Sequence, residues 1–155
     1  MIRINENIND VEAEIYEGEL IKLGNYEVDV FRNNEVKKLK LSDLKGKWTV
    51  LIFYPADFTF ICPTELEEVA DNYDKFKKLG AEVLSVSTDT AFVHKAWHDN
   101  SKAIKKISYP MIADPTGILC RFFGTYIEKE GLSLRGTFIL DPEGNLKAYE
   151  MNDNS

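Results

Sequence analysis

Cysteine and histidine are scarce in this chain, which has two of each among 155 residues. Two cysteines far apart in the sequence do not form the disulfide framework of a small secreted domain, so each thiol has to be judged separately. No apolar run reaches the about 18 residues of a membrane-spanning helix, and residues 1–10 lack the apolar core of a signal peptide. We therefore expect a cytoplasmic protein that does not insert into membranes.

Basic side chains are also few. Lysine and arginine total 19 against 26 aspartate and glutamate residues, which gives a net charge of −7 and an isoelectric point near 4.9. Nucleic acids and anionic membrane surfaces bind proteins through basic patches, so we expect neither as a partner. The sequence has no repeat, low-complexity segment or linker. Its length suits one domain over residues 1–155 that buries roughly two-thirds of the surface of the unfolded chain.

The apolar pattern predicts an α/β fold. After an irregular or short-stranded start, alternating or continuous apolar segments predict strands at 26–31, 36–41, 48–54, 82–87, 109–113, 132–140 and 146–151. Helical spacing predicts helices over 63–80 and 118–123, and one that carries Phe92, Val93, Ala96 and Trp97 behind a cap at Thr88 or Asp89. This order predicts a thioredoxin-like fold, with a mixed central sheet, helices on both faces and an N-terminal hairpin extension.

Cys62 stands where the predicted strand 48–54 gives way to the predicted helix 63–80. Pro55 ends the strand, and Glu65 lies early in the helix. This order places Cys62 in the first helical turn, beside unpaired backbone N–H groups and the positive end of the helix dipole. Both features favour the thiolate over the thiol, so we predict that Cys62 is a reactive cysteine.

A helix terminus alone does not account for a largely ionised cysteine. A thiol of ordinary pKa, about 8.5, is only a few per cent thiolate near neutrality. Lowering such a pKa to about 6 requires roughly 3.4 kcal/mol, whereas a helix terminus supplies about 0.3–2 kcal/mol. We therefore expect a permanent cation near Cys62. An arginine suits this role, because its guanidinium is always charged and can also hydrogen-bond a reacting oxygen.

Four residues carry a resemblance to a known family. Pro55, Thr59 and Cys62 form the pattern Pro-x-x-x-Thr-x-x-Cys, and Arg135 lies in the segment 134–138, Leu-Arg-Gly-Thr-Phe. With its flanks, the pattern is similar to the active-site signature of the peroxiredoxins, and Arg135 matches the distal arginine of that family. The resemblance spans nearly the whole chain. It is greatest to the typical two-cysteine group that includes the peroxidase subunit of bacterial alkyl hydroperoxide reductase.

The resemblance implies a thiol-dependent peroxidase that needs no metal or organic cofactor. The Cys62 thiolate would attack hydrogen peroxide or an organic hydroperoxide and become a sulfenic acid. Thr59 would hold the peroxide or the thiolate, Pro55 would shield the pocket, and Arg135 would stabilise the thiolate and the breaking O–O bond. The implied partners are the hydroperoxide, a thiol reductant that is a flavoprotein disulfide reductase or a thioredoxin-like protein, and further copies of the chain in a homodimer or decamer.

One part of the family pattern is absent. Typical two-cysteine relatives carry a resolving cysteine beyond the last strand, and we expect that this chain lacks that segment and is truncated. Cys120 is expected to pack in the core, with an intrachain resolving role as the alternative. Without a resolver, an external thiol has to reduce the sulfenic acid, or Cys62 is oxidised further. The alternative functions are an assembly or chaperone-like protein and a redox sensor, both with little turnover.

The two histidines have a spacing that metal sites use. His94 and His98 are four residues apart on a predicted helix, with Asp99 nearby. No glutamate follows His94 directly, and Trp97 on the same helix is expected to face the core. We therefore predict that both histidines lie on a solvated helix face and bind no metal.

Overall fold

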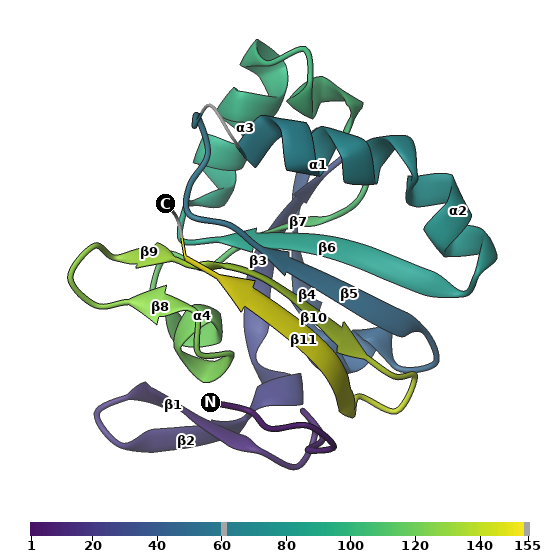
Figure 1. Ribbon diagram of the computed structural model, residues 1–155. Helices are drawn as coiled ribbons and strands as arrows, with labels where there is room; N and C mark the ends of the chain where they lie inside the picture. The colour runs from purple at the N-terminus through teal and green to yellow at the C-terminus, as the bar shows by residue number, and fades with distance from the viewer. Residues whose placement is uncertain (60–61, 154–155) are drawn as a thin grey trace.

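The structure, a computed structural model, describes residues 1–59 and 62–153 (Figure 1). Its strands are β1 (Glu12–Tyr16), β2 (Glu19–Lys22), β3 (Glu27–Arg32), β4 (Glu35–Lys40), β5 (Trp48–Phe53), β6 (Ala81–Ser87), β7 (Met111–Ala113), β8 (Tyr126–Ile127), β9 (Leu132–Ser133), β10 (Arg135–Leu140) and β11 (Leu146–Asn152). Its α-helices are α1 (Cys62–Asp71), α2 (Tyr73–Lys78), α3 (Ala91–Asn100) and α4 (Ile118–Phe122). None of the helices in the described ranges is both long and apolar enough to cross a membrane.

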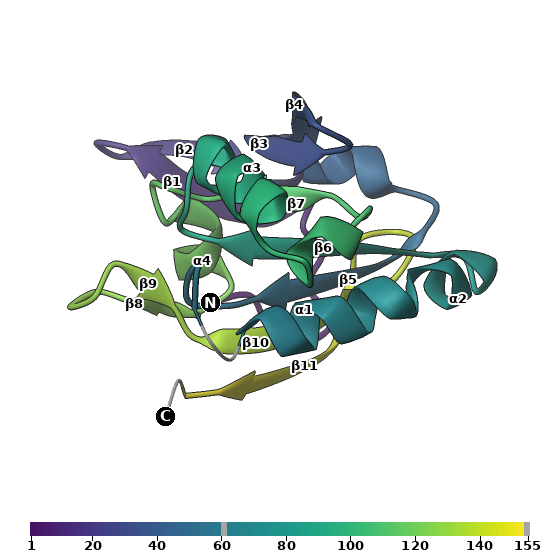
Figure 2. The same cartoon turned by 90° about the horizontal axis from the view of Figure 1, so that it is seen from above.

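A seven-stranded mixed sheet organises the molecule. Its strand order is β11-β10-β5-β6-β7-β3-β4, with β5, β6 and β7 parallel and the other neighbours antiparallel. Parallel strands require crossover connections, and here α1, α2 and α3 form them and cover one face of the sheet (Figures 1 and 2). The other face is covered by α4 and the hairpin β1–β2 (Figure 1). We call these the α1–α3 face and the α4 face.

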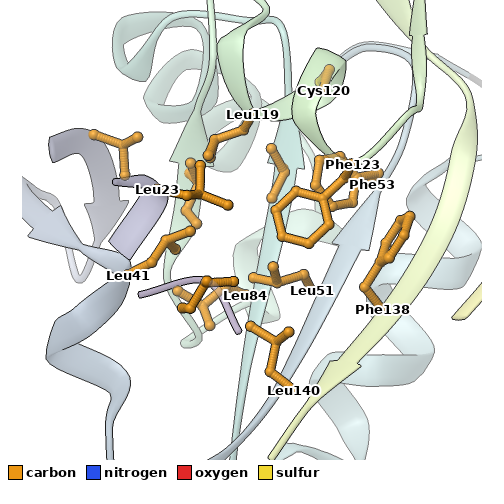
Figure 3. Packing of buried hydrophobic residues seen from close by; sticks show 14 of the residues in the cluster. Leu23, Leu41, Leu51, Phe53, Leu84, Leu119, Cys120, Phe123, Phe138 and Leu140 are labelled. Atoms are coloured by element: carbon orange, nitrogen blue, oxygen red, sulfur yellow. The ribbon is translucent and has the colours of Figure 1, made fainter. Parts of the chain in front are cut away.

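Each face carries its own apolar cluster, because successive side chains of β5 point to opposite sides. Phe53 is buried on the α4 face, where its ring centroid lies 5.3 Å from those of Phe123 and Phe138 (Figure 3). Its neighbour Ile52 packs on the α1–α3 face, in the cluster that contains Leu66 of α1. The central sheet therefore separates α1 from α4.

The predicted hairpin over 26–41 is present as β3 and β4. Its turn residues Asn33 and Asn34 have φ angles of 51° and 63°, a left-handed conformation that asparagine tolerates better than most residues. β3 pairs with β7 as well as with β4, so this hairpin forms one edge of the main sheet. A second hairpin, β1–β2, precedes it as a separate two-stranded sheet.

Two predicted elements are divided in the structure. The predicted helix 63–80 ends at Asp71, and α2 starts after Asn72, whose side chain donates to the carbonyl oxygen of Glu68 at 2.8 Å. Asparagine interrupts helices in this way because its side chain competes for backbone hydrogen bonds. The predicted strand 132–140 is two strands, since β9 pairs with β8 and only β10 joins the main sheet.

The cap of α3 also differs from the prediction. Thr90, rather than Thr88 or Asp89, precedes the helix, and its hydroxyl accepts the N–H of Val93 at 3.3 Å. The Asp89 carboxylate is engaged elsewhere, because it accepts the main-chain N–H of Asp57 at 2.8 Å. Asp89 thereby ties the approach to α3 to the connection between β5 and α1.

Candidate active site

The loop 54–59 connects β5 to α1 and carries two of the four predicted site residues. Pro55 is buried near its start, and Thr59 at its end donates its hydroxyl to the carbonyl oxygen of Ala56 at 3.2 Å. The helix α1 begins at Cys62, in agreement with the predicted first-turn position. The Cys62 side chain lies outside the described part of the structure. The backbone therefore places this residue at a helix N-terminus, where amide N–H groups favour an anion.

Arg135 contacts the first turn of α1. It opens β10, and the next residue, Gly136, pairs with Phe53 at the end of β5. The Nη1 atom of Arg135 donates to Oε1 of Glu65 at 2.6 Å. Glu65 follows Cys62 by three residues, so the two lie on the same side of α1. The guanidinium therefore stands beside the helix turn where the sequence predicts a permanent cation.

The guanidinium of Arg135 has a donor that is not used. The side chain is 19% exposed, and its Nε atom is buried with no hydrogen-bond partner among the described residues. A hollow of about 150 Å³ lies beside it, lined in part by Glu65, Thr137 and Glu150. A buried unpaired N–H is costly, so the positive charge of this guanidinium is only partly compensated by its hydrogen bond to Glu65. The site can thus stabilise negative charge at the start of α1.

A buried hydrogen-bond network holds the loop 54–59, and the sequence did not predict it. Oδ1 of Asp57 accepts the hydroxyl of Tyr54 at 2.5 Å, and Oδ2 lies 2.6 Å from Nδ1 of His94 on α3. The main-chain N–H of Asp57 donates to Oδ2 of Asp89. The side chains of Asp57 and His94 are both 0% exposed. Hydrogen bonds in such a low-dielectric environment are strong, and breaking one leaves a costly unpaired group.

Burial and mutual contact shift the pKa values within this network. Burial raises the pKa of Asp57, and the hydrogen bond from His94 opposes that shift only in part. Burial lowers the pKa of His94, but the hydrogen bond and charge of Asp57 outweigh it, so the net pKa lies above the ordinary value. Desolvation raises the pKa of Tyr54 well above its usual value, so its hydroxyl stays a donor. The Asp57–His94 pair therefore binds a proton tightly.

The prediction that both histidines lie on a solvated face is wrong for His94. His94 is fully buried, and its Nε2 atom lies 2.9 Å from the carbonyl oxygen of Ile112 on β7. The signal was present in the sequence, because His94 precedes Trp97 by three residues and therefore shares its core-facing side of the helix. The prediction also fails for His98, whose side chain is only 13% exposed. Its Nε2 atom lies 3.2 Å from the carbonyl oxygen of Ile107, and its ring centroid lies 5.2 Å from that of Phe31.

The spacing of the two histidines does not create a shared site. Instead, ligand-type atoms of Asp57, Asp89 and His94 lie within 4.8 Å of one another. Protein hydrogen bonds explain this proximity, since Asp57 contacts His94 and the hydroxyl of Ser87 donates to Oδ2 of Asp89 at 2.7 Å. These contacts account for the cluster without a cation.

Cys120 packs in the core, as predicted. It is fully buried in the cluster on the α4 face, and its main-chain N–H donates to Oδ2 of Asp114 at 2.9 Å. Burial, together with the nearby Asp114, raises the pKa of the Cys120 thiol well above its usual range. Leu66 of α1 belongs to the cluster on the opposite face. The sheet thus separates Cys120 from the helix that begins at Cys62, and this topology does not favour a direct disulfide between them.

The fold and the site define a class of protein. The class is that of thioredoxin-like α/β proteins in which an interior strand of a mixed sheet leads into a helix that begins with a cysteine. Within this class, the chain belongs to the AhpC/TSA family, whose sequence pattern matches residues 9–149.

Proteins named alkyl hydroperoxide reductase C are similar to this chain in sequence. The one from Staphylococcus haemolyticus is 55% identical over 121 residues, which cover 78% of this chain and 64% of the relative. The one from Salmonella typhimurium is 52% identical over 130 residues, which cover 84% of this chain and 70% of the relative. The chain thus spans 64% to 70% of the length of these two relatives.

Solved structures show the same fold. The crystal structure of Enterococcus faecalis AhpC has a TM-score of 0.87 and 41% sequence identity, and the match covers 100% of this chain and 84% of that chain. The reduced 2-Cys peroxiredoxin of Plasmodium vivax has a TM-score of 0.79 and 26% identity, with 83% and 81% of the two chains covered. These similarities confirm the predicted peroxiredoxin resemblance and the predicted thioredoxin-like fold.

Proposed function

We propose that this chain is a thiol-dependent peroxidase that reduces hydrogen peroxide and organic hydroperoxides at Cys62. The observation that carries the proposal is the ion pair of Arg135 with Glu65, which brings a guanidinium to the first turn of the helix that begins at Cys62. The helix terminus and the guanidinium both favour a thiolate, and together they supply more than the helix terminus alone. Membership of the AhpC/TSA family and similarity to alkyl hydroperoxide reductase C support the same chemistry.

In the proposed reaction, the Cys62 thiolate attacks the terminal oxygen of the hydroperoxide and the O–O bond breaks. The sulfur keeps that oxygen as a sulfenic acid, and the other oxygen leaves as an alkoxide or hydroxide that takes up a proton to give an alcohol or water. Arg135 stabilises the thiolate and the charge that develops on the leaving oxygen through its N–H groups.

The loop 54–59 supplies the remaining proposed roles. The hydroxyl of Thr59 donates to Ala56, so its lone pairs are available as acceptors. We propose that the Thr59 hydroxyl oxygen accepts a hydrogen bond from the O–H of the hydroperoxide. This contact would orient the peroxide for attack. Pro55, buried at the start of the loop, shields the thiolate from water.

An external thiol completes the proposed cycle. Cys120 is buried on the α4 face, so we assign the reduction of the sulfenic acid to a thiol reductant, either a flavoprotein disulfide reductase or a thioredoxin-like protein. We also propose that copies of the chain associate as dimers, and as larger rings built from them, through β11. This strand lies at one end of the sheet order. The main chain of Leu146 pairs with Asn5 and Glu6, and further along the strand Tyr149 is 44% exposed, which supports an edge available for pairing there.

Stopped-flow oxidation of the reduced chain by one equivalent of hydrogen peroxide tests the proposal. We expect a rapid single turnover that leaves a trappable sulfenic acid on Cys62, as identified by mass spectrometry. Cys62→Ser should abolish this phase. Cys120→Ala is the matched control, because its thiol is buried on the other face of the sheet, and it should react at the wild-type rate. A wild-type chain that reacts no faster than free cysteine would overturn the proposal.

Multiple turnovers distinguish the enzyme from the other two functions considered. Continued peroxide consumption in the presence of thioredoxin or a flavoprotein disulfide reductase supports a catalyst. A single turnover followed by transfer of the oxidation to a second protein identifies a redox sensor. Suppression of the aggregation of an unfolded client without peroxide consumption identifies a chaperone-like protein.

A further inference from the structure

Asp57 and His94 share one proton. The carbonyl oxygen of Ile112 can only accept, so Nε2 of His94, at 2.9 Å, carries hydrogen. At the other ring nitrogen, Nδ1 lies 2.6 Å from Oδ2 of Asp57. One proton occupies that contact, either on an imidazolium beside a carboxylate or on a carboxylic acid beside a neutral imidazole. Without it, two buried acceptors would face each other.

This pair anchors the loop 54–59 together with two further contacts. The Tyr54 hydroxyl donates to the second oxygen of Asp57, and the main-chain N–H of Asp57 donates to Asp89. The Asp57 carboxylate therefore connects the end of β5 to α3, and the Asp57 main-chain N–H connects the loop to the segment after β6. Phe58, the next residue in the loop, has a φ angle of 61°. A bulky residue adopts this left-handed conformation only where its surroundings hold it.

We propose that His94 is a positioning residue of the active site, which acts through Asp57 to hold the loop 54–59 in the conformation that presents Pro55 and Thr59 to the first turn of α1. Its effect on the peroxide reaction rests on the proposed function, whereas its effect on the loop does not. The physical link is short, because Asp57 directly follows Ala56, whose carbonyl oxygen accepts the hydroxyl of Thr59. A displacement of Asp57 would therefore move the hydroxyl that we assign to the peroxide.

Of the titratable groups around His94, Asp57 is the one that shares a proton with it. The titratable or charged groups near His94 are, by element, Asp57 and Tyr54 from the loop, Asp89 from the segment after β6, and Lys95 and His98 from its own helix. β7 contributes only the carbonyl oxygen of Ile112. The side chain of Lys95 is about half exposed and pairs with Asp99 at 2.7 Å, so it does not contact the network. Loss of the shared proton at high pH should therefore loosen the loop.

Two amide substitutions separate the two hydrogen bonds of His94. In His94→Asn, the side-chain amide nitrogen takes the position of the histidine Nδ1 atom and can still donate to Asp57. In His94→Gln, the amide nitrogen takes the position of the histidine Nε2 atom and donates to the carbonyl oxygen of Ile112 instead. We expect His94→Gln to slow the single-turnover oxidation of Cys62 about tenfold to a hundredfold, the usual cost of small misplacements at a reacting centre. His94→Asn should stay within about threefold of the wild type. His98→Asn, one turn along the same helix, is the matched control and should have no effect.

Hydrogen exchange and pH provide readouts that do not depend on loss of activity alone. In His94→Gln, amide protection should fall at residues 56–59 and stay unchanged in β10 and β11, which shows that the sheet remains folded. In the wild type, the oxidation rate should decline at alkaline pH after the thiolate is fully formed. This decline should be absent in His94→Asn, because an amide does not titrate.

The outcomes are distinct for the two proposals. Wild-type rate and wild-type protection of residues 56–59 in His94→Gln would overturn the positioning role. Equal losses in the asparagine and glutamine variants, with β10 and β11 still protected, would overturn it as well, since the hydrogen bond to Asp57 would then not be the determinant. If the wild type shows no rapid oxidation of Cys62, the proposed function fails. The protection of the loop then still decides whether His94 positions it.

Discussion

The two faces of the central sheet are built from different chemistry. On the α4 face, Phe53, Phe123 and Phe138 form a cluster of rings with centroid distances of 5.0 to 5.3 Å (Figure 3). On the α1–α3 face, the buried side chains include the hydrogen-bonded pair of Asp57 and His94. Apolar burial is non-directional and stabilises any close-packed arrangement, whereas a buried hydrogen bond specifies where two groups lie. The ring cluster therefore provides mainly stability, whereas the Asp57–His94 pair also fixes the position of the loop 54–59.

The largest expected effect falls on stability, at the α4 face. Phe138→Ala removes a ring that is fully buried against Phe53 and Phe123, and should lower the free energy of unfolding by about 3–5 kcal/mol. Urea unfolding monitored by circular dichroism measures this change in the free energy of unfolding. Phe92→Ala is the control, because that ring is 80% exposed and its loss should cost little. Equal losses for the two variants would contradict the difference drawn between core and surface.

The next effect falls on chemistry and not on stability. Arg135→Ala removes the cation from the first turn of α1, so the single-turnover oxidation of Cys62 should slow about a hundredfold, or about 2.7 kcal/mol of activation free energy. Its unfolding free energy should change by less than about 1 kcal/mol, since the pair with Glu65 lies near the surface. Arg121→Ala is the matched control, because Arg121 lies on α4, on the other face of the sheet, and pairs there with Glu128, which follows β8. An equally slow Arg121→Ala would argue against a specific role for Arg135.

A smaller effect is the pH dependence of the free energy of unfolding that the His94–Asp57 pair on the α1–α3 face should cause. The pKa of His94 in the folded chain is raised, because the hydrogen bond and charge of Asp57 outweigh burial. Its contribution to stability is thus fully present below the unfolded histidine pKa of about 6.5 and is lost as pH rises through the higher pKa of the folded chain. Urea unfolding between about pH 6 and 9 should therefore show a steeper loss for the wild type than for His94→Asn. Parallel curves would contradict the coupling.

The smallest expected effect concerns the exposed partner of Arg135. Glu65→Gln leaves an amide that can still accept from the guanidinium, and the lost charge sits on a side chain that is 52% exposed. The unfolding free energy should therefore change by less than about 1 kcal/mol, as is usual for surface ion pairs. Chemical denaturation and the oxidation rate of Cys62 measure the two consequences. A loss of rate as large as that of Arg135→Ala would show that Glu65, and not only Arg135, is required.

Local patterns predicted the elements on which the candidate site stands. The apolar run that became β5, the proline that ends it and the helix that begins at Cys62 are each decided by neighbouring residues. The break at Asn72 and the division near Leu134 were missed. At Asn72, a side-chain hydrogen bond to Glu68 interrupts a sequence with regular helical spacing. Near Leu134, the pairing of β9 with β8 divides a sequence with a regular strand pattern.

The contacts that complete the site could not be predicted from local pattern. Arg135 and Glu65 are 70 residues apart in the sequence, and His94 and Asp57 are 37 apart. The motif suggested an arginine for Cys62, but not its contact with Glu65. No local feature connected His94 to the loop, although its spacing from Trp97 was a sign that it is buried.

The sequence by itself determined the order of strands and helices, the cysteine at a helix start and the need for a cation, because these depend on periodicity, capping and the free energy of one ionisation. Only the tertiary structure decided which groups meet at that helix. Pairing of β10 with β5 brought Arg135 to α1, and packing of α3 against the sheet brought His94 to Asp57. These tertiary contacts depend on how the whole sheet is assembled, which no single stretch of sequence encodes.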